Sequence, residues 1–232
     1  MPPKSPDPAP PLPSRPAAAG RSMGQAAYEQ LHEAIETGQI KPGDRVSVNA
    51  LAETLQMSRT PVREAIAWLE TDGLIVHEPY LGRVVASLDR QMITELYAIR
   101  LVLETTAAGL AAQNASEAEV AVLQDMLAME QQVLADPIRR ERHNRRFHEA
   151  IYRSAHNRYL LTSLKALQSP MVLLGPATAS DPGRLESAYA EHIDLVDSIA
   201  RHDVDGARAA ITRHLAGGQR SRLRYMMQRE QG

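Results

Sequence analysis

The chain has 232 residues, with 26 basic and 28 acidic side chains, a formal net charge of -2 and no cysteine. This length suits two domains. The lack of cysteine excludes disulfides, thiolate zinc sites and cysteine nucleophiles, and agrees with a reducing cytosol. Because the chain is not a polycation, any affinity for nucleic acid must come from a few well-placed arginines and lysines.

The N-terminal segment, residues 1–23, is rich in proline and shows no apolar periodicity. Such a segment buries too little surface to offset chain entropy, so we expect a disordered tail, with a partner-binding polyproline segment as the alternative. No apolar run reaches the length of a membrane span or of a secretory signal. We therefore expect a cytoplasmic protein with no membrane partner.

Residues 24–88 show the pattern of a small DNA-binding domain. Three helical patterns come first, with a turn at 41–44 after the first and a tight turn at 56–58 after the second. Asp72-Gly73 ends the third pattern, and two β-rich runs follow around a turn. The predicted elements are helices over 25–38, 48–55 and from Thr60 to about Glu70, then strands over 74–78 and 83–86. This order predicts a winged helix-turn-helix.

The remainder, residues 89–232, shows helical periodicity without a further convincing strand. The periodicity is broken near residues 114–116, 135–137, 156–158, 175–182 and 202–203. We expect about six helices packed as a bundle. The predicted fold class is mainly α, with an N-terminal winged helix-turn-helix followed by an all-helical bundle.

The N-terminus of the third helix carries the residues expected to read DNA. Arg59 and Arg63 are four positions apart and project on one side of the helix. Arginine grips guanine O6 and N7 with two parallel hydrogen bonds, whereas hydroxyls such as those of Ser58 and Thr60 suit phosphate oxygens. Thr60 is also the predicted N-cap, before Pro61 at the first helical position. An ordinary surface helix with two solvated arginines is the alternative.

Three histidines in the helical part have a spacing that favours a shared metal site. His148 lies four residues after Asn144, on one helix face. His192 and His214 each lie 11 residues from the break at Asp203, so on antiparallel helices both lie about 16 Å from the turn. Three imidazoles and one oxygen ligand can hold a divalent metal ion, with open positions for water or a carboxylate. Taken singly, a histidine is more often a hydrogen-bonded core or surface residue than a metal ligand.

The helix-turn-helix residues resemble a known family. The segments LAETLQM, SRTPVREAIAWLETDGLI and GRVVA are similar to the winged helix of the GntR family of bacterial regulators. The resemblance implies a homodimer on near-palindromic, double-stranded operator DNA. It places Arg59 and Arg63 at bases, Ser58 and Thr60 at phosphates, and Gly82 at the wing tip in or near the minor groove. Arg45 matches an arginine often found before the second helix.

The helical part resembles the FCD effector domain of the FadR-type branch of that family. The segments that carry the likeness are YAIRLVLETTAAGLAA, NRRFHEAIYRSAHN and EHIDLVDSIARHDVDGARAAITRH. The resemblance implies metal ligands at Asn144, His148, His192 and His214, and a contact from Arg100 to the carboxylate of an effector. Zn²⁺ is the expected ion, with Ni²⁺, Mn²⁺ or Fe²⁺ as alternatives.

One of these positions departs from the family pattern. Metal-binding members have an aspartate where this chain has Asn144. An amide oxygen brings no charge, so weaker metal retention is expected. A pocket without a metal ion is the alternative interpretation. The residue-level alternative for Arg100 is a surface pair with Glu104, four positions later.

The sequence therefore predicts a regulator, and a repressor in particular, whose operator binding responds to a small organic acid. It does not predict an enzyme. Two alternatives stay open. One is a metal-dependent enzyme fused to a DNA-binding module, although the sequence places no obvious general base beside the three histidines. The other is a regulator whose helical domain only dimerises.

Overall fold

The computed structural model describes residues 22–174 and 182–230, which divide into two compact units at Ser87–Leu88. The described part is mainly helical, which confirms the predicted fold class. The predicted tail lies outside the described residues except for Ser22 and Met23, which begin the first helix. The break expected at 175–182 lies outside them too, apart from Pro182, where α9 begins.

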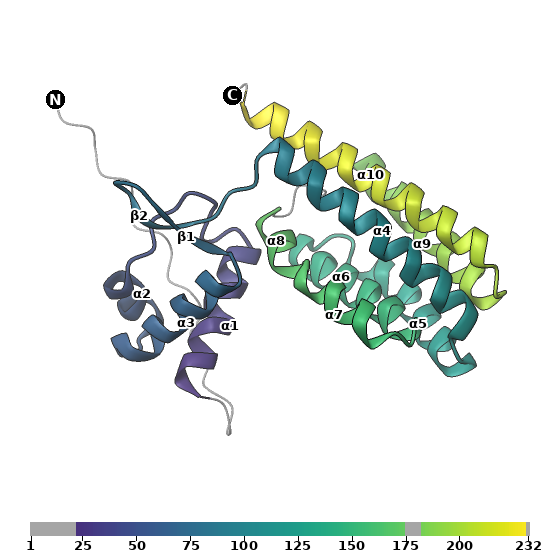
Figure 1. Cartoon of the computed structure of the whole chain (residues 1–232), viewed down its shortest axis with the longest axis horizontal. Coiled ribbons are helices and arrows are strands. Elements are labelled where there is room, and N and C mark those ends of the chain that lie inside the picture. The colour runs from purple at the N-terminus through teal and green to yellow at the C-terminus, as the bar shows by residue number, and fades with distance from the viewer. Residues whose placement is uncertain (1–21, 175–181, 231–232) are drawn as a thin grey trace. The chain divides into compact units, whose positions relative to one another are not determined.

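The N-terminal unit contains three helices and a hairpin (Figure 1). The hairpin is antiparallel, with Ile75 opposite Val85 and Glu78 opposite Gly82. The element bounds are α1 Met23–Glu36, α2 Val48–Leu55, α3 Arg59–Thr71, β1 Ile75–Glu78 and β2 Gly82–Val85. This is a winged helix-turn-helix, as predicted.

The turn between α2 and α3 fixes the orientation of α3. Gln56 ends α2 in the left-handed conformation, with φ of 55°, and the chain reverses there. The apolar stripe of α3, including Val62, Ile66 and Leu69, is buried against the other helices of this unit. The opposite face of α3, with its arginines, is left in solvent.

The prediction of Thr60 as the N-cap of the third helix was wrong. Ser58 is the N-cap, and α3 begins at Arg59. The first N–H groups of a helix have no partner within it, so Pro61 is tolerated anywhere in the first turn and does not mark the first residue. A proline near a helix start therefore locates that start only to within a turn.

The wing is linked to α3 through an ion pair from β2, and its tip is exposed. Arg83 Nε lies 2.6 Å from Glu70 Oε1, which links β2 to α3. Pro79, Tyr80 and Leu81 connect the strands, and Tyr80 has φ of +66°. The left-handed region costs a residue with a side chain about 1–2 kcal/mol. Tyrosine thus occupies a position that favours glycine or asparagine.

The C-terminal unit is all helical and has seven helices among its described residues, one more than the sequence predicted. The additional boundary lies at Leu167, between α7 and α8, where neither glycine nor proline marks it. The bounds are α4 Arg90–Asn114, α5 Glu117–Val133, α6 Pro137–Ser154, α7 Arg158–Ala166, α8 Gln168–Leu173, α9 Pro182–Ala200 and α10 Val204–Glu230.

Helix α4 is the structural centre of this unit. It packs along α10 and also contacts α6, α7 and α9. Its inward face carries Ala107, Ala108, Ala111 and Ala112, all fully buried, and such small side chains allow close approach of neighbouring helices. The arrangement brings one face each of α6, α9 and α10 around the same interior. No helix in the described ranges is long and apolar enough to cross a membrane.

Candidate functional site

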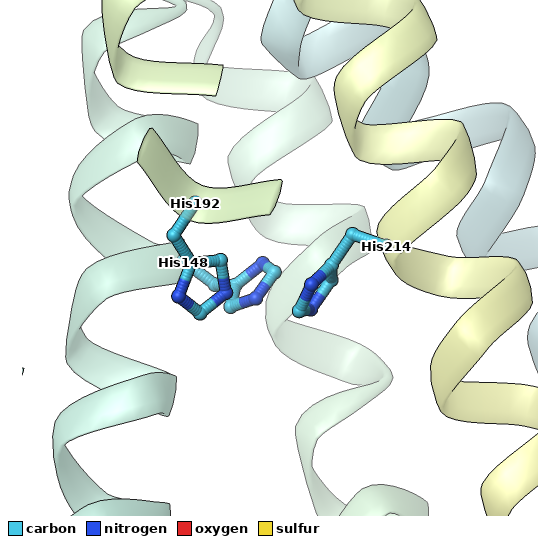
Figure 2. A group of neighbouring side chains, drawn as sticks. All are labelled: His148, His192 and His214. Atoms are coloured by element: carbon cyan, nitrogen blue, oxygen red, sulfur yellow. The ribbon is translucent and has the colours of Figure 1, made fainter. Parts of the chain in front are cut away.

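Three histidines from three helices meet inside the C-terminal unit. His148 comes from α6, His192 from α9 and His214 from α10, and Figure 2 shows their rings gathered together. One ligand nitrogen of each lies within 4.8 Å of the others, and all three residues are buried. The rings of His192 and His214 are 4.5 Å apart, in keeping with their equal distances from Asp203 in sequence.

Each of the three imidazoles has a glutamate beside its Nδ1 atom. His192 Nδ1 lies 2.9 Å from Glu130 Oε2, and His214 Nδ1 lies 3.1 Å from Glu191 Oε2. His148 Nδ1 lies 3.2 Å from Glu104 Oε2, within ion-pair range but not aligned for a hydrogen bond. The Nε2 atoms of His148 and His192 are buried and have no hydrogen-bond partner.

This arrangement has the chemistry of a metal site. A carboxylate that accepts the Nδ1 proton of a ligand histidine fixes the tautomer and leaves the Nε2 lone pair for the ion. Burial of an imidazole nitrogen without a partner is otherwise unfavourable. The residues present therefore fit a divalent metal ion bound by three histidines, the donor type that suits Zn²⁺ and Ni²⁺.

Burial keeps two of these histidines neutral. Desolvation lowers the pKa of His192, although Glu130 partly opposes the shift. Desolvation and the neighbouring His192, His148 and Arg184 lower the pKa of His214 well below its usual value. Since only neutral imidazole binds a metal, the lowered pKa values extend the ligand form of both side chains to a lower pH than is usual for histidine.

Arg100 forms a buried ion pair beside the histidines. Its Nε atom lies 2.7 Å from Glu104 Oε1, and its guanidinium carbon lies 4.8 Å from the ring centre of Tyr97. The predicted pairing with Glu104 is present, but the description of it as a surface pair was wrong, because Arg100 is 5% exposed and Glu104 is 1% exposed. Burial by itself would raise the pKa of Glu104, but the charge of Arg100 and the contacts with His148 and Tyr152 together outweigh burial and lower that pKa to about 2.

A small cavity joins these groups. Its volume is about 80 Å³, and Arg100, Asn144, His192 and His214 all line it. An adjoining cavity of about 20 Å³ is lined by His148 and shares Arg100 and Asn144 with the first. The structure thus brings together every residue of the helical part that the sequence singled out. The space suits a small ligand.

Arg184 is a further member of the site that sequence reasoning missed. Its guanidinium lies 2.6 Å from Glu191 and donates to the backbone carbonyl of His214 over 3.0 Å. It fills a niche on α10 at Gly217, where an added Cβ would lie 2.8 Å from the guanidinium. The signal was the pair Gly217-Gly218 inside a helix, which is unfavourable there unless something approaches closely.

The three glutamates were missed as well. The sequence places no carboxylate as an obvious general base beside the histidines, yet Glu104, Glu130 and Glu191 all lie next to them. Glu191 precedes His192 directly, but it contacts His214 on the next helix. Glu130 lies 62 residues before its partner His192, so no local spacing reveals it. Each of these carboxylates lies within ion-pair distance of the Nδ1 atom of one histidine.

The expected DNA-reading residues lie on the solvent face of the N-terminal unit. Arg59, Arg63, Ser58 and Thr60 are all exposed around the first turn of α3. Within residues 22–174 and 182–230, neither arginine makes an ion pair.

The remaining two positions lie at the wing. Arg45 is exposed and forms an isolated β-bridge with Val84 of β2. Gly82 is the first residue of β2, so it adjoins the tip formed by Pro79, Tyr80 and Leu81. A groove beside the wing is lined by Arg45, Ser47, His77 and Arg83, among others.

Family models match both units. The model described as "Bacterial regulatory proteins, gntR family" matches residues 23–85, and the FCD domain model matches residues 95–217. The chain belongs to the GntR family. Its FCD domain contains the three histidines, Asn144 and Arg100, and its GntR domain contains α1 to α3 and the wing. It is a DNA-binding transcriptional regulator and not an enzyme.

Individual relatives agree with this assignment. The regulator McbR of Escherichia coli is 30% identical over 194 residues, which cover 81% of this chain and 86% of McbR. A solved structure of E. coli McbR/YncC superposes with a TM-score of 0.74 at 26% identity, covering 88% of this chain and 98% of that one. A probable D-xylose utilization operon repressor of Paenarthrobacter nicotinovorans is 32% identical over 185 residues, 78% of this chain and 80% of the relative.

We predict that Arg100→Met lowers the free energy of unfolding of the FCD domain by about 3–5 kcal/mol, because Glu104 is left as an uncompensated buried charge. Urea denaturation of the full chain measures this. The control is Arg213→Met, which breaks the pair with Asp194, where the side chains are 53% and 60% exposed. An exposed pair contributes at most about 1 kcal/mol. Equal losses in both variants would contradict the role assigned to the buried pair.

Proposed function

We propose that this regulator is a homodimeric repressor whose operator binding responds to a small carboxylate effector, bound in the FCD domain beside a divalent metal ion. One observation carries the proposal: three histidines with their Nδ1 atoms beside carboxylates line cavities that also contain buried Arg100. The P. nicotinovorans relative is named a probable repressor, which supports repression rather than activation as the role proposed for this chain. Such a protein acts in the cytoplasm, where the chromosome lies.

The proposed DNA contacts follow from the exposed face of α3. Arg59 and Arg63 have the length and donor geometry to bind guanine in the major groove. Ser58 and Thr60, at the helix N-terminus, suit phosphate oxygens. Arg45 and Gly82 both line the groove on the protein surface beside the wing, and we propose them as further DNA contacts. Because the chain carries a net charge of -2, a dimer that doubles these contacts is expected to be required.

The proposed metal ligands are His148, His192 and His214, with the amide oxygen of Asn144 as a fourth. Asn144 lines both cavities, one helical turn before His148. Zn²⁺ is the proposed ion, and Ni²⁺, Mn²⁺ and Fe²⁺ suit the same donors. When bound, the ion would supply a positive centre with open positions for a carboxylate. All four protein ligands are neutral, so the anionic effector would supply the negative charge.

Arg100 is the proposed second contact for the effector. It lines both cavities while Glu104 holds its Nε atom, and this contact orients the guanidinium. The cavity volume of about 80 Å³ favours an acid with few non-hydrogen atoms. For the acid to act as a signal, it must bind one arrangement of the dimer better than another, and the difference in affinity limits the size of the response.

We predict that Arg63→Ala abolishes specific operator binding and leaves the fold intact, because this side chain is exposed and outside the core. A duplex recovered by the wild-type protein from a random-sequence pool serves as the operator in a gel-shift titration. The control is Arg146→Ala, an exposed arginine of α6. Unchanged affinity, or loss of the circular dichroism signal, would contradict the proposed placement of Arg63.

We predict that the purified protein retains about one equivalent of divalent metal per chain, and that His192→Ala and His214→Ala both lose it. Elemental analysis after gel filtration measures the content. His143→Ala is the matched control, since His143 is also buried on α6 but contacts the Met126 carbonyl at 2.9 Å. Asn144→Asp should retain metal more tightly, because it adds a negative ligand. Stable, folded wild-type protein that takes up no metal would limit the histidines to a structural role.

We predict that a small carboxylate which binds the metal-loaded protein changes operator affinity, and that Arg100→Lys weakens the effect of the acid. A lysine keeps the charge but loses the planar donor geometry that grips a carboxylate. Titration calorimetry identifies the acid, and gel-shift titrations with and without it measure the coupling. If the acid that binds leaves operator affinity unchanged, the FCD domain is not a sensor for it.

A further inference from the structure

The larger cavity of the FCD domain continues beyond the histidines along α10. His214, Gly218 and Arg222 all line it, and Arg222 comes eight residues after His214. Eight residues correspond to about 12 Å along a helix axis. Gly218 has no side chain that could fill the space between the other two. The cavity therefore extends from a proposed metal ligand to a second cationic side chain.

Arg140 of α6 lines the cavity at the same end as Arg222. Helix α6 runs parallel to α4 and α10 runs antiparallel to it, so the start of α6 and the end of α10 lie on the same side of the histidines. The contacts that fix these directions are Glu104 with His148 and Asn114 with Ala155 for α6, and Tyr97 with Gly218 and Gly109 with Arg208 for α10. Arg140 comes eight residues before His148, which matches the spacing of Arg222 from His214.

Backbone carbonyls orient both of these arginines. Arg140 Nη1 donates to the Leu134 carbonyl over 2.6 Å, and Arg222 Nη1 donates to the Leu174 carbonyl over 2.8 Å. Arg222 is 6% exposed, so its charge lies in the interior. A guanidinium has five N–H donors, and one in a fixed orientation can bind a carboxylate through two parallel hydrogen bonds. The two side chains thus have the chemistry of an anion site.

The charges around the cavity favour a ligand with two negative charges. Within the part of the chain that the structure describes, the arginines that line the cavity are equal in number to the glutamates that line it or pair with those arginines. They are Arg100, Arg140, Arg184 and Arg222, and Glu104, Glu130, Glu141 and Glu191. A divalent ion held by neutral ligands would add two positive charges, and a buried excess of charge is unfavourable. A dianion would restore the balance.

We propose that the effector is a short dicarboxylic acid, and that Arg140 and Arg222 bind its second carboxylate. The first carboxylate binds the metal ion and Arg100. The carbon chain between the two groups passes over Gly218. This inference rests on the proposed function and adds the chemical class of the effector and the second site that selects it.

The first test compares acids whose carbon chains have the same length. Titration calorimetry of the zinc-loaded full chain measures malonate, succinate and glutarate against propionate, butyrate and valerate. At least one diacid should bind about tenfold or more tightly than its matched monocarboxylate, because it gains hydrogen bonds between charged groups. Equal affinities in all three pairs overturn the inference and leave a response to a carboxylate in place. If no acid binds, the proposed function fails and the inference fails with it.

The second test removes the proposed site and leaves the metal ligands in place. Arg140→Met should lower the affinity for the preferred diacid about ten- to hundredfold and leave that for the matched monocarboxylate within about twofold. Arg222→Lys keeps the buried charge, but it should also weaken the diacid because lysine lacks the planar pair of donors. Elemental analysis should find an unchanged metal content in both variants.

The matched control is Arg139→Met, which removes the exposed arginine next to Arg140 in α6. Arg139 is not among the described residues that line the two cavities. This variant should bind both acids as the wild type does. Equal losses for the diacid and the monocarboxylate in Arg140→Met would show a general disturbance of the pocket and would overturn the assignment of a second carboxylate site.

Discussion

The FCD domain is organised around a buried set of ionisable groups. Three imidazoles, three glutamates and two arginines lie where α4, α5, α6, α9 and α10 meet, and most of them are less than one-tenth exposed. Placing such groups in an interior is unfavourable unless each finds a partner. Here the pairs Glu104 with Arg100, Glu130 with His192, and Glu191 with Arg184 provide those partners. The helices must therefore hold these side chains in register for the domain to be stable.

The same requirement explains the composition of the surrounding helices. The alanines of α4 allow neighbouring helices to approach closely, and the glycines of α10 leave room for long side chains, Arg184 at Gly217 and Tyr97 at Gly218. Polar groups that contact one another in a low-dielectric interior hold each other in defined orientations. A pocket formed in this way has its donors in place before a ligand arrives, which lowers the entropic cost of binding.

Local patterns in the sequence revealed the elements and missed their mutual contacts. The helical period located α1 to α3 and the wing, and the equal distances of His192 and His214 from Asp203 anticipated their proximity. In contrast, Glu130 lies 62 residues before His192 and contacts it from another helix. Periodicity within one helix cannot predict such a contact. The boundary between α7 and α8 was also hidden, since the residues around Leu167 are compatible with a continuous helix.

The niche at Gly217 constrains how the FCD domain can move. Arg184 of α9 lies against the α10 backbone where any Cβ would collide with it, and it also donates to the carbonyl of His214. If α10 slid along α9 so that Ala216 took the place of Gly217, its methyl group would crowd the guanidinium. The contact of Arg184 with Gly217 and its hydrogen bond to the His214 carbonyl therefore favour movement of α9 and α10 together. A rearrangement that carries a signal through this domain is then expected at the other helix contacts.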